Sequence, residues 1–118
     1  MIRPIFVFGS NEAGRHGRGA ALFARENYGA VYGEGIGITG HAYAIPTKDK
    51  FIRTLPLEKI KLYVDDFLKF ARENRHLPFF VTRIGCGLAG YKDWQIAPMF
   101  KGYPENCIIM PEEWKPYI

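Results

Sequence analysis

Residues 2–25 are IRPIFVFGSNEAGRHGRGAALFAR, and they contain the three parts of an α/β unit in order. Ile2–Phe8 is apolar and rich in residues that favour strands, so we predict a buried strand that stops at Gly9. Four glycines fall within residues 9–19, and the alanine-rich stretch after Gly19 favours a helix. The unit is therefore a strand, a glycine-rich turn and a helix.

The rest of the chain continues the alternation of strands and helices. Further strands are predicted in three short apolar runs, over residues 41–45, 79–84 and 106–110. Pro46 is expected to stop the first of these strands. We expect a glycine-rich loop, with room for a short hairpin, over residues 29–40, and an irregular tail over residues 111–118 that packs through Trp114 and Tyr117.

Two further helices are expected in the second half of the chain. The clearer one covers residues 56–72, with Pro56 in its first turn, because apolar side chains recur there every three or four residues. Its predicted buried face consists of Leu57, Ile60, Val64, Phe67, Leu68 and Ala71. A shorter helix is predicted over residues 93–100, with Asp93 as its N-cap and Pro98 removing one hydrogen bond. Its expected buried side chains are Trp94, Ala97 and Phe100.

This alternation predicts an α/β fold in which a mixed, mostly parallel sheet is flanked by helices, with residues 1–118 forming one domain. Ligands on such sheets bind beyond the carboxyl ends of the strands. Two glycine-rich segments, after Phe8 and after Ile84, follow predicted strands directly. We therefore expect both segments to face one shared crevice.

Composition narrows the class of function. The chain has 118 residues and a formal net charge of +4, a modest excess that favours anionic partners without by itself indicating a nucleic acid. The cysteines, Cys86 and Cys107, and the three histidines lack the spacing of a disulfide framework or a metal site, so no metal and no cofactor is expected. We find no signal peptide and no apolar stretch of membrane-spanning length, so we expect a cytoplasmic protein without a membrane partner.

The first candidate site is the turn over residues 9–19. Glycines let backbone N–H groups approach an anion closely, and the following helix directs its positive end toward a phosphate. Arg15 and Arg18 can add charge-assisted hydrogen bonds. The predicted ligand-binding residues are Ser10, Asn11, His16, Gly17, Arg18 and Gly19. The turn is neither a Walker A loop nor a strict GxGxxG turn, and the alternative is a flexible surface loop.

The second candidate site is IPTK, residues 45–48, directly after a predicted strand. Lys48 is either a solvated charge or a usable nucleophile. Partial burial and the neighbouring cations Lys50 and Arg53 would favour a neutral amine that can attack an aldehyde carbon. Thr47 is predicted to bind the ligand and Lys48 to be catalytic.

The third candidate site is RIGCGLAGYKDW, residues 83–94, after another predicted strand. Its small residues make a turn tight enough to hold a diphosphate or a ribose, and the alternative is a turn that holds a helix against the sheet. Its predicted ligand-binding residues are Gly85, Cys86, Gly87, Leu88, Ala89, Gly90 and Tyr91. Cys86 can be read as a nucleophile, but no motif ties a histidine or asparagine to it, and a buried structural thiol is the favoured interpretation.

The pairing of IPTK at residues 45–48 with RIGCGLAGYKDW at residues 83–94 resembles the macro-domain branch that removes ADP-ribose from modified macromolecules. This branch includes terminal ADP-ribose protein glycohydrolases and DNA ADP-ribosyl glycohydrolase antitoxins. The resemblance covers residues 43–100, and residues 10–21 are similar to the macro glycine turn around the distal ribose. It implies a three-layer, macro-domain-like fold, with the diphosphate between the two glycine loops, adenine in a side pocket and Lys48 as the catalytic residue.

One position departs from the family pattern. The protein-directed enzymes have an aspartate directly after GCGL, whereas this chain has Ala89, which moves the resemblance toward the DNA-directed antitoxins. The implied function is hydrolysis of an ADP-ribosyl linkage on DNA or protein by Lys48. The alternative is a module that binds ADP-ribose or a related nucleotide signal without turnover, and direct nucleic-acid binding through the basic surface is a third hypothesis. The sequence leaves the oligomeric state open.

Overall fold

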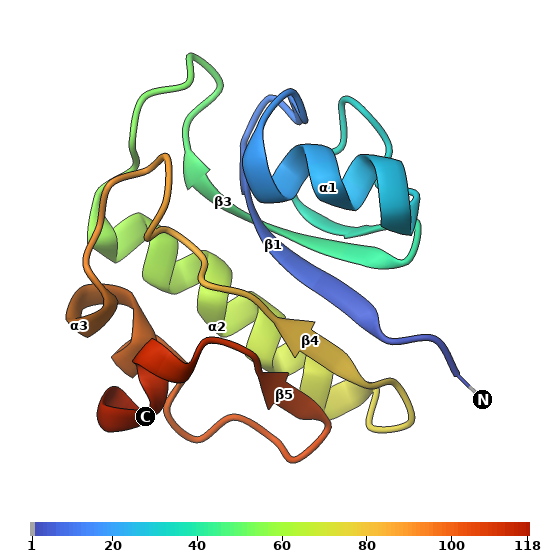
Figure 1. Ribbon diagram of the computed structural model, residues 1–118, viewed down its shortest axis with the longest axis vertical. Coiled ribbons are helices and arrows are strands. Elements are labelled where there is room, and N and C mark those ends of the chain that lie inside the picture. The colour runs from blue at the N-terminus through green and yellow to red at the C-terminus, as the bar shows by residue number, and fades with distance from the viewer. Residues whose placement is uncertain (1) are drawn as a thin grey trace.

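The computed structural model describes residues 2–118 and has a five-stranded sheet at its centre (Figure 1). The strands lie in the order β2-β3-β1-β4-β5. Their bounds are Ile5–Asn11 for β1, Gly37–Thr39 for β2, Ala42–Lys48 for β3, Phe79–Val81 for β4 and Cys107–Ile109 for β5. β2 is antiparallel to β3, and the other neighbouring pairs are parallel. The predicted mixed, mostly parallel sheet is confirmed.

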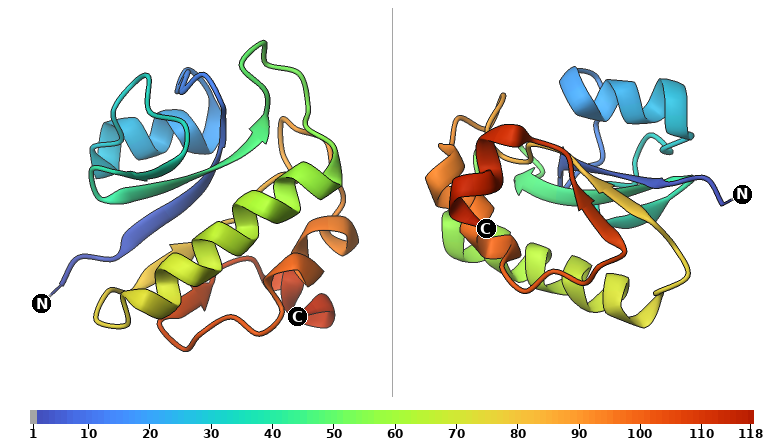
Figure 2. Two further views of the ribbon diagram at one scale, coloured as in Figure 1. Left: turned by 180° about the vertical axis from the view of Figure 1, so that it is seen from behind. Right: turned by 60° about the horizontal axis from the view of Figure 1, so that its bottom comes forward.

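Helices cover both faces of this sheet (Figure 2). α1 (Gly19–Tyr28) packs on one face, and the longer α2 (Leu57–Glu73) lies across the other. The short α3 (Asp93–Ile96) and two 3-10 turns, Ala97–Phe100 and Glu112–Tyr117, join the α2 side. The chain therefore has a three-layer α/β fold. Within residues 2–118, no helix combines the length and apolarity needed to cross a membrane.

The two faces of the sheet are packed unequally. The core between the sheet and α2 contains eighteen buried hydrophobic residues, whereas the core beneath α1 contains six. The α1 core consists of one aromatic ring among small side chains: Phe8, Ala21, Ala24, Ala30, Ala42 and Ala44. The α2 core contains large rings in contact, with Phe67 and Phe79 centred 5.4 Å apart and Phe100 and Trp114 5.3 Å apart.

α2 confirms the predicted periodicity closely. It begins after Pro56, whose fixed φ suits a helix start and whose missing N–H is not needed there. Its buried residues are Ile60, Val64, Phe67, Leu68 and Ala71, all of them predicted. Leu57, also predicted to be buried, is only partly so, because it lies in the first turn.

The predicted end of β3 at Pro46 is wrong, since the strand continues through this proline to Lys48. The pairing of β2 with β3 stops at Gly37, opposite Ala44, so only one side of β3 is paired at Pro46. The ladder with β1 also shifts register between Ser10 and Asn11, opposite this point. Proline is tolerated at strand edges and bulges because no ladder hydrogen bond needs its missing N–H there.

The other strand predictions differ in their ends. β1 begins at Ile5 rather than at Ile2. It ends at Asn11 rather than at Phe8, because its pairing with β3 extends to Asn11. β4 stops at Val81 rather than at Ile84, where the chain turns into the second glycine-rich segment. The loop over residues 29–40 contains one strand, β2, and its hairpin partner is β3, which lies after this loop.

The region after Tyr91 corrects five predictions. The helix over residues 93–100 divides at Ala97 into α3 and a 3-10 turn, and its N-cap is Lys92 rather than Asp93. Trp94 is 62% exposed rather than buried, and Trp114 from the tail packs against Phe100 in the core instead. The tail is a 3-10 helix rather than irregular, with Trp114 buried as predicted but Tyr117 exposed.

Candidate functional site

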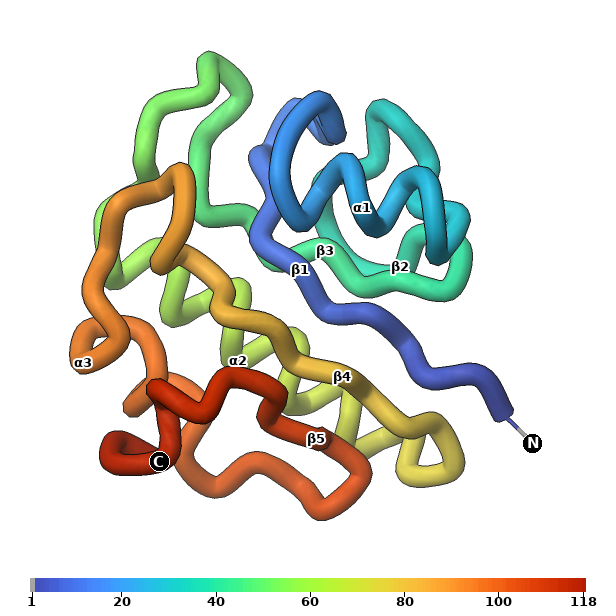
Figure 3. The backbone as a smooth tube through the Cα atoms, in the orientation of Figure 1, coloured from blue at the N-terminus to red at the C-terminus, as the bar shows by residue number. Residues whose placement is uncertain are grey.

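A cleft of about 730 Å³ opens at the carboxyl end of the sheet, where the chain leaves β1 and β4. We call residues 12–19 the first loop and residues 82–92 the second loop, and Figure 3 shows both at the same end of the molecule. The cleft is lined by many of the predicted site residues, namely Ser10, Asn11, Gly17, Arg18, Gly19, Thr47, Lys48, Gly85, Gly87, Leu88 and Ala89. The crevice expected from the sequence is therefore present, because β1 and β4 are neighbours in the sheet.

The second loop approaches β1 at one level and the first loop at another. At the floor, a Cβ placed on Gly9 would lie 3.6 Å from the amide nitrogen of Gly85. At the mouth, a Cβ on Gly19 would lie 3.7 Å from Cδ1 of Leu88. Small residues at both levels keep the walls close without closing the cleft, and Leu88, 62% exposed, supplies an apolar edge between them.

Polar side chains at the end of β1 give the first loop its conformation. The Asn11 amide donates to the Arg15 carbonyl, and its Oδ1 accepts from the Arg15 N–H, both at 2.9 Å. The Ser10 hydroxyl donates to the Gly35 carbonyl at 2.5 Å, and the Thr47 hydroxyl donates to the Ser10 carbonyl at 3.3 Å. These side chains therefore hold the backbone and leave main-chain groups to meet a ligand.

Several residues that line the cleft have main-chain N–H groups without an acceptor in residues 2–118. α1 begins at Gly19 with no side-chain cap, and its first residues, Gly19 to Ala21, line the cleft. The first turn of a helix has no intrahelical acceptors for its N–H groups and carries the positive end of the helix dipole. The amides of Gly17, Gly87 and Leu88 likewise donate to no acceptor within residues 2–118. Together they form a surface suited to an anion.

The charged groups of the cleft have one sign. Its charged lining residues are Arg15, Arg18, Lys48 and Arg83, and among the described residues no aspartate or glutamate lines it. Arg83 is paired with Asp93 and Glu113, while the other three cations form no ion pair with any residue from 2 to 118. A cationic, partly apolar cleft favours a ligand that carries negative charge on an organic body.

The second loop is fixed at both ends. Asp93 accepts two hydrogen bonds from the Arg83 guanidinium, and its Oδ1 also accepts from Nε1 of Trp114 at 2.9 Å. These partners lower the pKa of Asp93 to about 2, with the Arg83 hydrogen bond as the largest cause. The Tyr91 hydroxyl donates to the Leu55 carbonyl at 2.5 Å. The loop is thus held open by contacts behind it.

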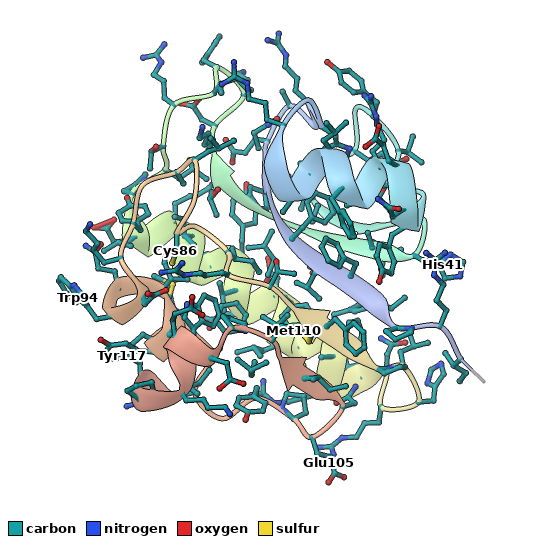
Figure 4. All side chains as sticks on the ribbon, in the orientation of Figure 1. His41, Cys86, Trp94, Glu105, Met110 and Tyr117 are labelled. Atoms are coloured by element: carbon teal, nitrogen blue, oxygen red, sulfur yellow. The ribbon has the colours of Figure 1, made fainter. Side chains whose placement is uncertain are left out.

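Three predicted residues of the second loop lie behind this wall. Cys86, Gly90 and Tyr91 line a separate polar hollow of about 430 Å³ and not the main cleft. Figure 4 shows Cys86 on the side of the molecule that also carries Trp94 and Tyr117. Burial raises the pKa of the Cys86 thiol to about 11, so the group is protonated at neutral pH, and both cysteines are free. This supports the structural rather than the nucleophilic interpretation of Cys86.

His16 also lies outside the cleft, although it belongs to the first loop. It is completely buried, and neither ring nitrogen has a hydrogen-bond partner among residues 2–118. Its ring packs edge-on against Phe8 at 5.5 Å and against Tyr32 at 6.2 Å. Burial lowers the pKa of His16, so it serves as a neutral spacer beneath the loop rather than as a ligand-contacting group.

The cleft also contains residues outside the predicted set. The sequence indicates that Arg15 can add charge-assisted hydrogen bonds. Arg83 lies near the end of a predicted strand, and this position is a signal by which it could be found. Ile52 reaches the cleft from the turn after β3 and gives no sequence signal, because a lone apolar residue in a polar turn is common. Its φ of 65° is unusual for a β-branched residue.

Comparison with known proteins supports the fold and gives no information about activity. No protein-family model matches the chain, and no curated protein matches it. The solved structure of a protein of unknown function from Bacteroides thetaiotaomicron is similar, with a TM-score of 0.57 and 17% sequence identity. The match covers 86% of this chain and 81% of that chain. At this identity, the similarity shows that the two proteins share an α/β fold.

Proposed function

We propose that the chain is a macro-domain-like protein that binds ADP-ribose or a related nucleotide in the cleft and hydrolyses an ADP-ribosyl linkage, with Lys48 as the catalytic residue. The observation that carries this proposal is the meeting of two glycine loops over one cleft whose free charges are all positive. Its volume of about 730 Å³ falls within the ordinary range for sites that bind small molecules and cofactors.

The diphosphate is assigned to the unpartnered amides on the two loops. The N–H groups at the start of α1, together with those of Gly17, Gly87 and Leu88, belong to residues that line the cleft and have no acceptor within residues 2–118. Such groups are arranged before the ligand arrives, so binding requires little reorganisation. Arg15 and Arg18 add charge-assisted hydrogen bonds to the phosphate oxygens.

Lys48 is the candidate nucleophile, because it is the lining residue whose side chain carries an amine that can form an imine with a sugar carbon. The bond between C1 of the distal ribose and the ring oxygen first breaks, and the ring oxygen takes up a proton, which leaves C1 as an electrophile still bonded to the linking atom of the modified group. The neutral Lys48 amine then adds to this C1. The bond from C1 to the modified group then breaks, and that group leaves with its electron pair and takes up a proton. Water hydrolyses the resulting imine, which releases ADP-ribose and returns the Lys48 amine.

A second candidate function is binding without turnover. The lining contains no aspartate or glutamate among the described residues, and Ala89 occupies the position of the aspartate in the protein-directed enzymes. General acid–base catalysis normally needs such a group within hydrogen-bond reach of the reacting atoms. Affinity for the nucleotide depends on the amides and cations, so it would persist without this acid.

Titration calorimetry with free ADP-ribose and incubation with ADP-ribosylated oligonucleotides and proteins separate these functions. Saturable binding with release of ADP-ribose supports the enzyme. Binding with the modification left intact supports the binding module, and absence of any binding of ADP-ribose overturns both. The two free thiols, Cys86 and Cys107, support a cytoplasmic location, because reducing compartments keep thiols unpaired.

A further inference from the structure

A second feature lies beside the cleft, in the turn over residues 49–54, which we call the 49–54 tip. Lys48 and Thr54 form an isolated antiparallel bridge at its base, so residues 49–53 project as a short hairpin. Phe51 at this tip is 65% exposed, the largest exposure among the large hydrophobic side chains of residues 2–118. It belongs to neither core, so packing does not account for an aromatic residue there.

The 49–54 tip is held in one conformation. Oδ1 of Asp49 accepts from the N–H of Phe51 at 2.8 Å and from the N–H of Arg53 at 3.0 Å. The Asp49 N–H donates to the Arg53 carbonyl at 2.8 Å, which closes the turn. Ile52 has a φ of 65°, a left-handed conformation that is strained for a β-branched side chain. Strain of this kind persists where the surroundings enforce it, and it concentrates at functional sites.

Two cations flank the exposed ring. Nζ of Lys50 lies 5.6 Å from the centre of the Phe51 ring, and Cζ of Arg53 lies 5.2 Å from it. Neither cation has an ion-pair partner among residues 2–118. The carboxylate of Asp49 is engaged by main-chain N–H groups of the tip itself. The 49–54 tip therefore presents an exposed aromatic ring with two unpaired cations lying over it.

The 49–54 tip adjoins the mouth of the cleft. Ile52 lines the cleft directly, as does Lys48 at the base of the tip. The Thr54 hydroxyl donates to the Ala89 carbonyl at 3.1 Å, which attaches the tip to the second loop. Arg15 and Arg18 of the first loop are exposed and line the same cleft. Positive charge thus continues from the tip across the opening.

We propose that the 49–54 tip binds single-stranded nucleic acid, with a base stacked on Phe51 and backbone phosphates in contact with Lys50 and Arg53. An exposed aromatic ring between cations is the combination used by proteins that bind single strands without sequence preference. A protein partner would bury apolar neighbours around the ring, whereas the residues that flank Phe51 in space are charged. In a duplex the bases are already stacked, so the ring selects unpaired bases.

The position of the 49–54 tip gives this binding a consequence. A nucleic-acid strand bound at Phe51 would place a neighbouring nucleotide near the cleft. The substrate of the proposed hydrolysis would then be an ADP-ribosylated nucleic acid. This consequence rests on the proposed function. Binding of single strands to the 49–54 tip does not rest on it, because the test uses unmodified strands, which contain no ADP-ribose.

The test measures fluorescence anisotropy of labelled, unmodified single-stranded DNA and RNA of about 12 nucleotides. Phe51→Leu removes the ring but keeps an apolar side chain, and we expect about tenfold weaker binding, whereas Phe51→Trp preserves it. Replacing both Lys50 and Arg53 by Gln should reduce the slope of log affinity against log salt by about 1.4, since single strands lose about 0.7 per phosphate contact. The DNA and RNA arms show which strand is preferred.

The matched control replaces Lys69 and Lys101 by Gln, which removes the same charge from exposed positions away from the 49–54 tip. This control should leave the salt slope at its wild-type value. Equal affinities of Phe51→Leu and Phe51→Trp, equal slopes in the two double variants, or equal binding of single strands and duplex would each overturn the proposal. Calorimetry of the wild-type protein and of Phe51→Leu with ADP-ribose is a separate readout. If the wild-type protein does not bind ADP-ribose, the proposed function of the cleft is refuted, and the proposal for the 49–54 tip still stands or falls on the binding of unmodified strands.

Discussion

The Arg83 guanidinium and the Asp93 carboxylate join the two ends of the second loop. Nε of Arg83 lies 2.8 Å from Oδ1 of Asp93, and Nη2 lies 2.7 Å from Oδ2. This two-point geometry fixes the orientation of both groups, and the Trp114 indole adds a third hydrogen bond from the tail. The conformation of the second loop therefore depends on Asp93 and Trp114, which do not line the cleft, as well as on Arg83, which does.

Asp93→Asn should destabilise the protein by about 1–2 kcal/mol, because it removes a charged acceptor from a network that is partly open to water. The pKa of Asp93 is lowered from 3.8 to about 2, so the ionised form stabilises the fold above pH 3.8 and this contribution disappears as the pH falls toward 2. Thermal denaturation between these pH values should show a steeper loss for wild type than for Asp93→Asn. Parallel curves would contradict this role of the carboxylate.

Lys48→Arg should separate binding from catalysis. Arginine keeps the positive charge near the phosphates but is not a usable nucleophile, so ADP-ribose affinity should stay within a few-fold of wild type. Turnover should fall by more than about a hundredfold. Calorimetry and release of ADP-ribose from a modified oligonucleotide provide the two measurements. Undiminished turnover by the Arg variant would exclude Lys48 as the nucleophile.

Gly35→Ala should destabilise the first loop. A Cβ at this position would lie 2.0 Å from the Asn11 carbonyl oxygen and 2.8 Å from the Gly14 nitrogen, so backbone must move. We expect a loss of roughly 1–3 kcal/mol, seen as a lower Tm, together with weaker ADP-ribose binding. Gly17→Ala is the matched control: its Cβ meets nothing within 4 Å, so its Tm should equal that of wild type. Similar Tm values for both variants would argue against this contact.

His16→Leu should remove a pH dependence of stability. In the unfolded chain an imidazole gains a proton as the pH falls below 6.5, whereas burial lowers the pKa of His16 in the fold. The unfolded state therefore binds more protons below this pH, and the stability of wild type falls as the medium becomes acidic. Urea denaturation at pH 7.5 and at about pH 5 should show a smaller difference for His16→Leu. The exposed His76→Leu should behave like wild type.

Local patterns in the sequence predicted the parts of the fold that depend on local chemistry. The strand, turn and helix up to Arg25 and the apolar face of α2 follow from composition and periodicity over a few residues. The shared crevice was expected from the sheet type, but it also required β1 and β4 to be neighbours, which depends on pairing between distant segments.

The errors arose where distant residues decide the outcome. Pro46 lies within a strand because the pairing of β2 with β3 does not reach it, and no local signal reports the length of a partner strand. Trp94 is exposed because Trp114, from the tail, fills the core next to Phe100. His16 is buried inside a polar, glycine-rich turn, and such a turn normally indicates exposure. The Phe51 ring gave no signal, since its importance depends on the adjacent cleft.

The unequal packing of the two layers predicts which parts of the protein open locally to solvent. The first loop and α1 rest on six buried residues, whereas the second loop rests on the layer that holds eighteen. Amide hydrogens of α1 should therefore exchange with solvent through local opening. Those of α2 should exchange more slowly, because their exchange requires near-global unfolding. A ligand spanning both loops would tether the loosely packed half to the rigid one. Slower exchange in α1 on adding nucleotide would be the signature of that tether.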